Sequence, residues 1–217
     1  MNRTQLLNIL IDRYQYSAYL ELGVDRNINF NNIDVADKTG VDIKPNATYS
    51  MTTDKFFEIC HRKFDLIFID ACHEAEQAYR DFTNSLACLN DGGCIVFHDC
   101  MPKQEIHQTK RRRSNSWTGD VWKAFIRVRQ RADVNAFVLD ADWGLGIVFK
   151  QPNTDQVPHI RPLNWQTYVD HHQKLLRVVS VTDLYKTLPA PTNPKNIALI
   201  TGKAPDQLNK EAWATFE

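Results

Sequence analysis

The stretch Phe64-Asp65-Leu66-Ile67-Phe68-Ile69-Asp70-Ala71-Cys72-His73 decides how the fold of this chain is interpreted. Its apolar run from Leu66 to Ile69 is unbroken and of strand length, which is typical of a parallel sheet covered on both faces. Asp70 ends the run, and His73 follows three residues later. In open α/β sheets ligands collect beyond the carboxyl ends of the strands, so this pair is placed to meet one. In the structural alternative Asp70 caps the following helix and His73 lies in its first turn.

A second apolar run repeats this arrangement further along the chain. Residues 74–89 have helical periodicity, and Asp91-Gly92-Gly93 supplies a stop for that helix. The strand that follows, 94–97, ends in His98-Asp99. Two successive strands therefore deliver an acid and a histidine to the same sheet edge, which favours a functional site over two structural caps.

The rest of the chain continues the alternation of strands and helices. The sequence predicts helices at 4–14, 52–60, 118–131, 163–179 and 181–188, with Thr4 as the first cap, and strands at 19–24, 47–51, 135–139 and 146–149, with one more ending at Val41-Asp42. This order predicts a doubly wound, mostly parallel α/β sheet of seven strands with an antiparallel strand near the C-terminus.

Length and proline content predict the domain organisation. The chain has 217 residues, which suits one domain. We expect that domain at 1–188, with its core at 19–150 and C-terminal helices at 163–188. The prolines, Asn193-Pro194 and Gly202 predict an extended tail at 189–217. Such a tail would suit the arm of a homodimer or a link to another domain.

Composition excludes several classes of function. Basic and acidic residues both number 26, so no global charge favours nucleic acid or an anionic membrane as a partner. No apolar run approaches the roughly 18 residues of a membrane span. The five cysteines contain no Cys-x-x-Cys pair, which argues against a zinc ribbon and for reduced thiols. We therefore expect a soluble cytoplasmic protein.

The order of these motifs resembles the class I S-adenosylmethionine-dependent methyltransferases. The resemblance covers roughly residues 19–150 and rests on Glu21-Leu22-Gly23, Asp42, Thr53-Asp54, the strand that ends at Asp70, and Gly92-Gly93. Asp70-x-x-His73, His98-Asp99 and the segment 117–123 are most similar to the branch of metal-dependent sugar O-methyltransferases.

This resemblance implies a set of cofactor-binding residues. An acid at Glu21 would lie near the methionine end of S-adenosylmethionine, and the turn at Gly23 would let the backbone approach the cofactor. Asp42 would accept hydrogen bonds from the ribose hydroxyls, or would be a turn residue. The remaining implied cofactor residues are Thr53, Asp54 on the adenine side, and Asp70. Asp54 could equally be an acid favoured by the N-terminus of a helix.

The first loop departs from the family pattern, because Val24-Asp25-Arg26-Asn27-Ile28-Asn29 replaces the usual glycine-rich run. Asp and Asn adopt positive φ more readily than most residues, and S-adenosylmethionine has no pyrophosphate to cradle. The departure therefore counts more heavily against a dinucleotide-binding dehydrogenase than against a methyltransferase.

Methyl transfer to a hydroxyl needs alignment of the reactants and removal of a proton. Asp70 and Asp99 offer hard oxygen ligands for Mg²⁺ or another divalent ion, which would lower the pKa of the hydroxyl. His73 would then be the general base, and His98 a ligand, a second base or an orienting group. In the metal-free alternative His73 or His98 is the base, while Asp70 and Asp99 orient it and contact the substrate.

The sequence also bears on the acceptor. The basic run Lys110-Arg111-Arg112-Arg113 would flank the site and bind a nucleotide diphosphate or an anionic glycan, or it is a solvated loop. Trp117 and Trp143 could offer flat faces to a sugar ring, whereas Trp122 suits the core.

These observations predict an O-methyltransferase that acts on a hydroxyl of a sugar or glycan, free or nucleotide-linked. Three alternatives remain open: a metal-independent O-methyltransferase of small molecules, a binding module that has lost catalysis, and a metal-dependent hydrolase on the same fold.

Overall fold

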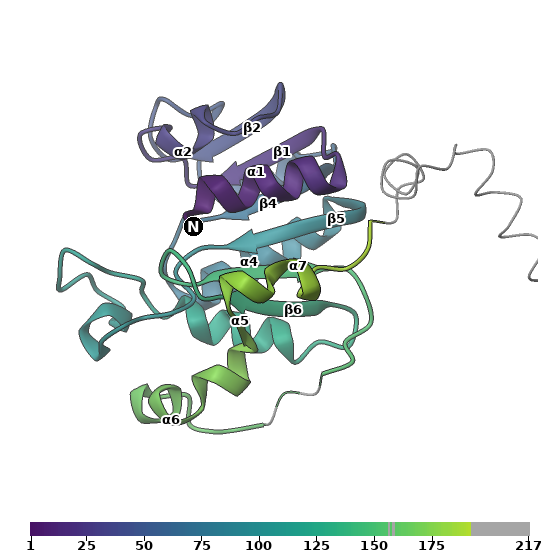
Figure 1. The fold of residues 1–217 in the computed structure, drawn as a ribbon. Coiled ribbons are helices and arrows are strands. Elements are labelled where there is room, and N and C mark those ends of the chain that lie inside the picture. The colour runs from purple at the N-terminus through teal and green to yellow at the C-terminus, as the bar shows by residue number, and fades with distance from the viewer. Residues whose placement is uncertain (156, 158, 192–217) are drawn as a thin grey trace, which may run out of the picture.

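The computed structural model describes residues 1–155, 157 and 159–191, and its centre is one eight-stranded sheet (Figure 1). The strands lie in the order β3-β2-β1-β4-β5-β7-β6-β8. Their bounds are β1 Ala18–Leu22, β2 Asp37–Asp42, β3 Tyr49–Ser50, β4 Phe64–Ile69, β5 Leu89–Phe97, β6 Asn135–Leu139, β7 Leu145–Phe149 and β8 Val178–Val179. Only β7 runs antiparallel, to both β5 and β6. The predicted doubly wound α/β fold with its antiparallel strand is confirmed.

The predicted strand count of seven is wrong by one. The eighth strand is β8, which pairs in parallel with β6 through two residues. The sequence had placed these residues in the last helix, because a two-residue strand at a sheet edge leaves no periodicity to detect.

Helices cover both faces of the sheet. Their bounds are α1 Arg3–Tyr14, α2 Ile28–Asn31, α3 Thr53–Ile59, α4 Ala75–Ala87, α5 Val121–Arg129, α6 Trp165–Leu176 and α7 Leu184–Thr187, with short 3₁₀ turns η1 at Glu105–Gln108 and η2 at Val181–Asp183. The helices α3, α4, α5 and α6 contribute to the apolar core on one face, and α1 and α7 contribute to the core on the other. No helix within the described part of the chain is both long and apolar enough to span a membrane.

Strand β4 is buried from both sides, as its apolar run predicted. Ile67 and Ile69 pack into the core under α4 and α5, whereas Leu66 and Phe68 pack into the core under α1. All four side chains are buried. Neither face of such a strand meets water, so its residues do not alternate between polar and apolar, which explains the continuous run.

The starts of α1 and β5 are among the element boundaries that differ from the prediction. Helix α1 is capped by Asn2 rather than Thr4, through a capping box in which Asn2 Oδ1 accepts from Gln5 N–H at 3.0 Å and Gln5 Oε1 accepts from Asn2 N–H at 2.9 Å. Strand β5 begins at Leu89 rather than Cys94, so Gly92-Gly93 lies inside the strand, where the register shifts against β4. A bulge tolerates glycine within a strand.

The strands that matter for function meet at one edge. Asp70 N–H donates to Leu22 C=O at 2.8 Å, and His98 N–H donates to Ile69 C=O at 3.0 Å. The carboxyl ends of β1, β4 and β5 are therefore adjacent, and β1 is the strand from which the sheet is wound in both directions. Most of the predicted tail, from residue 192 onward, lies outside the described residues, so the domain boundary at 188 stays a prediction.

Candidate functional site

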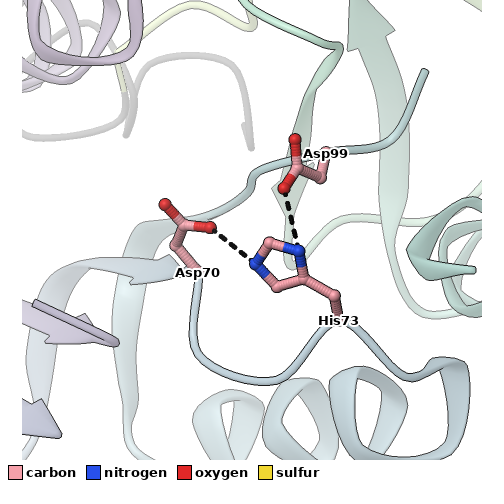
Figure 2. A group of neighbouring side chains, drawn as sticks. All are labelled: Asp70, His73 and Asp99. Atoms are coloured by element: carbon pink, nitrogen blue, oxygen red, sulfur yellow. Dashed lines mark ion pairs between the residues drawn. The ribbon is translucent and has the colours of Figure 1, made fainter. Parts of the chain in front are cut away.

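His73 lies between two carboxylates at the carboxyl edge of the sheet (Figure 2). Its Nε2 is 3.4 Å from Asp70 Oδ1, and its Nδ1 is 3.2 Å from Asp99 Oδ2. Burial favours the neutral imidazole, but the two acids outweigh burial and raise the pKa of His73 above its ordinary value. The structure thus brings together three of the residues that were predicted from two separate strands.

Asp70 does not cap the following helix, so the structural alternative for this residue is wrong. The N-cap of α4 is Glu74, and the Ala75 N–H donates instead to Asp120 Oδ1 at 2.8 Å. Burial opposes the charged form of Asp70, but His98, His73 and Arg3 outweigh it and hold the pKa of Asp70 well below its usual range. Asp70 is therefore an anion whose oxygens face cations.

His98 is deeper in the protein than His73. Its Nδ1 lies 3.3 Å from Asp70 Oδ1 and 3.1 Å from Asp99 Oδ1, and its Nε2 lies 3.5 Å from Asp142 Oδ1. Burial lowers the pKa of His98, but these three acids raise it well above its ordinary value. Neither nitrogen makes a well-formed hydrogen bond to any described protein group. The surrounding acids thus favour the charged form of the His98 imidazole while its nitrogens lack well-formed hydrogen bonds, which suits an orienting group better than a base.

Trp117 and Gly119 hold His73 from the far side. The Trp117 indole stacks on the His73 ring at 4.8 Å between centroids, and its carbonyl oxygen lies 3.3 Å from His73 Nδ1. Asp120 N–H donates to His73 C=O at 3.1 Å. A Cβ at Gly119 would lie 1.7 Å from that carbonyl oxygen, so only glycine permits the contact. This clamp explains why α5 starts at Val121, later than its predicted start at residue 118.

Sequence reasoning missed two charged members of the site, Arg3 and Asp142. Arg3 Nη1 donates to Asp70 Oδ2 at 2.7 Å, and Arg3 Nε donates to Asp142 Oδ2 at 3.0 Å. The two acids outweigh burial and raise the pKa of Arg3. Arg3 is separated from Asp142 by 139 positions, so no local pattern could have paired them.

Left-handed backbone marks the loops that carry these acids. Asp99 has φ of 61°, and Asp142, Trp143 and Gly144 have φ of 43°, 66° and 86° in succession. Non-glycine residues in this region are uncommon and cluster at functional sites. In the sequence, the signal that could have pointed to this loop is an acid followed by Trp-Gly, in Asp142-Trp143-Gly144.

Glu21 lies at the end of β1 and is almost fully buried. Tyr19 Oη donates to Glu21 Oε2 at 2.6 Å, and Asn29 Nδ2 donates to the same oxygen at 2.9 Å. Burial raises the pKa of Glu21 to about 7, against the opposing effect of these two hydrogen bonds and with a further contribution from Asp70. Glu21 is therefore an oriented acid that is partly protonated near neutral pH.

The loop after β1 takes the backbone shape that its sequence predicted. Gly23, Asp25 and Asn27 all have positive φ, of 91°, 45° and 60°. A Cβ at Gly23 would lie 2.3 Å from Asp70 C=O, so glycine here lets the ends of β1 and β4 meet. Asp25 N–H donates to Asp42 Oδ2 at 2.9 Å, and Lys44 N–H donates to Asp42 Oδ1 at 3.0 Å. Asp42 is thus a turn residue that still has free lone pairs.

Two predicted cofactor residues face another helix. Thr53 Oγ1 donates to Asp81 Oδ1 at 2.7 Å, and Asp54 Oδ1 accepts from Arg80 Nε at 3.0 Å. Both contacts tie α3 to α4. Neither side chain lines the clefts described below, so their role in cofactor binding stays a prediction.

Two adjoining cavities follow this edge of the sheet. A cleft of about 610 Å³ contains Asp42, the His73 cluster, Trp117 and Trp143, and it also includes the exposed apolar side chain of Ile43. A second cavity of about 350 Å³ contains Glu21. Trp122 is fully buried, as predicted. Of the basic run, Arg112 lines the larger cleft, and Lys110 lines a separate cavity between α4 and α5.

The donor set suits a divalent cation. One ligand atom from each of Asp70, His73 and Asp99 lies within 4.8 Å of the other two. Two carboxylate oxygens and an imidazole nitrogen are ligands that several divalent ions accept. The ligand atoms are thus of suitable types, but the guanidinium of Arg3 already contacts Asp70 Oδ2 at 2.7 Å, which works against a bound ion.

The fold is similar to that of several solved methyltransferase structures. A putative caffeoyl-CoA O-methyltransferase from Staphylococcus aureus superposes with a TM-score of 0.54 at 16% identity, over 68% of this chain and 82% of that one. An SAH-bound methyltransferase from Podospora anserina gives 0.56 at 14% identity, over 69% and 78%. An O-methyltransferase from Bacillus cereus in complex with SAH gives 0.50 at 14% identity, over 67% and 78%.

Residues 12–100 match a family model described as a methyltransferase domain. That range contains every predicted cofactor and catalytic residue and includes Asp99 near its end. No curated protein matches the sequence. The predicted resemblance to S-adenosylmethionine-dependent methyltransferases is thereby confirmed.

Proposed function

We propose that this protein is an S-adenosylmethionine-dependent O-methyltransferase that methylates a hydroxyl of a sugar or glycan. The observation that carries the proposal is the position of His73, held between Asp70 and Asp99 beside a cleft at the carboxyl edge of the sheet. The match to a methyltransferase domain and the O-methyltransferases among its structural neighbours favour oxygen as the acceptor atom.

The cofactor would lie along the two adjoining cavities. Glu21 would face its amino group, Asp42 has lone pairs for the ribose hydroxyls, and Ile43, 75% exposed, offers an apolar surface for the base. SAH is bound in the Bacillus cereus and Podospora anserina structures. These features support S-adenosylmethionine as the methyl donor.

In the proposed reaction the acceptor oxygen attacks the methyl carbon of the sulfonium, and the carbon–sulfur bond breaks with its electron pair remaining on sulfur. The hydroxyl proton passes to a ring nitrogen of His73. Because Asp70 and Asp99 stabilise the imidazolium that results, they strengthen His73 as a base. His98 is buried, its neighbouring acids raise its pKa, and it would hold Asp70 and Asp99 in place.

A divalent ion, if one bound, would be held by Asp70, Asp99 and one nitrogen of His73 and would acidify the acceptor hydroxyl, but the contact of Arg3 with Asp70 opposes its binding. The two indoles, Trp117 and Trp143, offer apolar faces for the ring of the acceptor. They support a sugar ring, and equally an aromatic ring such as that of caffeoyl-CoA, which the name of the Staphylococcus aureus neighbour gives as its acceptor.

Calorimetric titration with SAH tests the proposal directly. We expect saturable binding that Asp42→Asn weakens by about tenfold or more, the cost of one or two hydrogen bonds to the ribose. Asp37→Asn is the matched control, because Asp37 lies at the opposite end of the same strand and pairs with Arg62. Absence of binding at millimolar SAH would overturn the proposal and favour a module without catalysis.

A further inference from the structure

Arg3 places a permanent positive charge beside Asp70. The guanidinium donates to Asp70 Oδ2 from Nη1 at 2.7 Å, and to Asp142 from Nε at 3.0 Å and Nη2 at 3.3 Å. Its backbone N–H also donates to Asp142 Oδ2 at 2.8 Å. Arginine stays charged at any relevant pH and binds carboxylates in this forked geometry. The first residue of α1 therefore joins the ends of two loops that lie far away in the sequence.

The turn that carries Asp142 fixes the guanidinium in place. Cys100 N–H donates to Gly144 C=O at 3.0 Å, and Met101 N–H donates to Trp143 C=O at 2.6 Å. These bonds tie the left-handed turn to the segment that follows Asp99. Because Asp142 is held from one side and Arg3 is held by Asp142, Arg3 cannot leave Asp70 without breaking several contacts.

Arg3 also stands where the two cavities meet. It lines both the smaller cavity that contains Glu21 and the larger cleft that contains His73, and Asp70 is likewise shared by both. The methyl group of a cofactor that spans these cavities would pass this junction. The positive charge of Arg3 at this junction therefore acts on Asp70, the acid that faces His73.

The same contacts work against a divalent ion. One oxygen of Asp70 already accepts from Arg3, and the other faces His73 and His98. An ion at Asp70 would lie close to a fixed like charge and would bind an oxygen pair whose charge is already partly neutralised. Arg3 thus lowers the affinity of the donor set for the ion that it could otherwise hold.

We infer that Arg3 is the resident cation of this site: it occupies the side of Asp70 that a divalent ion would need, and it positions Asp70 against His73 so that methyl transfer proceeds without a bound metal. This inference rests on the proposed function. Arg3 is a positioning residue, since it acts on the reaction through Asp70.

Direct measurement of Mn²⁺ binding tests the inference without any turnover. By calorimetry and by the loss of the free-ion electron paramagnetic resonance signal, we expect Arg3→Gln to bind Mn²⁺ at least tenfold more tightly than the wild type. Arg13→Gln is the matched control, because Arg13 lies at the other end of the same helix against Tyr14 and Tyr185. Equal affinity in wild type and Arg3→Gln, or no binding by either, would overturn the inference.

A second measurement separates positioning from folding. Arg3→Lys keeps the charge but loses the fork, so we expect it to bind Mn²⁺ as weakly as the wild type and to lower kcat with little change in KM for the cofactor. Added guanidinium ion should restore part of the kcat of Arg3→Gln, a rescue that a merely structural role would not give. Tight Mn²⁺ binding by Arg3→Lys would contradict the inference.

Chelation distinguishes failure of this inference from failure of the proposed function. Wild-type turnover should be unchanged after exhaustive treatment with EDTA. If SAH binds and methyl transfer is observed but EDTA abolishes it, the inference fails while the proposed function stands. If SAH does not bind, the proposed function itself fails.

Discussion

Two buried basic residues of this protein, Arg129 and His98, differ in how fully their side-chain nitrogens are hydrogen-bonded. Arg129, on α5, is 1% exposed and donates to Leu175 C=O, Ala136 C=O and Asp155 Oδ2 at 3.3, 2.7 and 2.8 Å. His98 is as deeply placed, yet neither of its nitrogens has a well-formed hydrogen bond to the described residues, although three acids lie within 3.5 Å. Arg129 joins elements far from the cleft, whereas His98 lines it.

This difference distinguishes a buried charge that stabilises the fold from one that serves a functional site. A buried charge that serves only stability needs every donor satisfied, because an unpaired group costs about 1–3 kcal/mol. A charge that serves a site keeps unused capacity for a ligand or for a moving proton. Replacing a charge of the structural kind should lower the free energy of unfolding and leave ligand binding intact. Replacing a charge of the functional kind should impair ligand binding or turnover and leave the free energy of unfolding nearly unchanged.

The largest expected effect is on turnover. His73→Gln removes the proposed base, and general base catalysis contributes roughly 10²–10⁴-fold. We expect kcat to fall by that factor, while SAH affinity and the thermal unfolding temperature stay close to the wild type. His61→Gln is the control, since His61 is exposed on the segment before β4. Wild-type kcat in His73→Gln would remove His73 from the reaction.

The next effect is a pH dependence of stability from Glu21. Its pKa of about 7 in the folded protein lies above its ordinary value of 4.5. Between these values the folded state binds a proton that the unfolded state has lost, so the free energy of unfolding falls as pH rises from about 4.5 to 7. A difference of this size corresponds to about 3 kcal/mol.

Urea unfolding at pH 5 and pH 8 measures this dependence, with the Glu21→Gln variant as the comparison. The variant should lose the part of the decrease that Glu21 causes, because a neutral amide replaces the titrating acid, whereas the part that comes from the raised pKa values of His73 and His98 should remain. A wild-type stability that rises between these two pH values, with the same rise in Glu21→Gln, would contradict the assignment.

The smallest expected effect is a loss of stability on replacing Arg129, the fully hydrogen-bonded member of the comparison. Arg129→Met leaves two buried carbonyl groups without their donor, while Asp155 is half-exposed and regains water, so we expect a loss of about 2 kcal/mol in the free energy of unfolding. SAH affinity should not change. Arg131→Met, two residues along the chain with its partner Asp133 exposed, should lose less. An equal loss in both variants would show that satisfaction of Arg129 is not what matters.

The sequence predicted the parts of the site that follow from strand order. The apolar run of β4 and the repeat of an acid with a histidine after β5 were sufficient, because parallel strands bring their carboxyl ends to one edge. Asp70, His73 and Asp99 meet there as expected.

The missed parts depend on contacts that no local pattern encodes. Arg3 comes from a helix on the opposite face of the sheet, and Asp142 comes from the turn between β6 and β7. For Thr53 and Asp54, no sequence pattern indicated their contacts with Asp81 and Arg80 of α4, which depend on how two helices pack, and their cofactor role stays a prediction. The predicted metal at Asp70 and Asp99 is untested, and the contact of Arg3 with Asp70 argues against it.

His73 is held by its contacts with Trp117, Gly119 and Asp120, and these contacts have a consequence for the kinetics of the reaction. These three residues continue directly from the loop at 101–116, whose Arg112 and Ser116 line the acceptor side of the cleft. Since His73 is stacked on Trp117 and its carbonyl accepts a hydrogen bond from Asp120 N–H, we expect a displacement of the loop to displace His73 as well. A substitution that shifts this loop will therefore alter the chemical step together with acceptor binding, and selection for a new acceptor must act within that coupling.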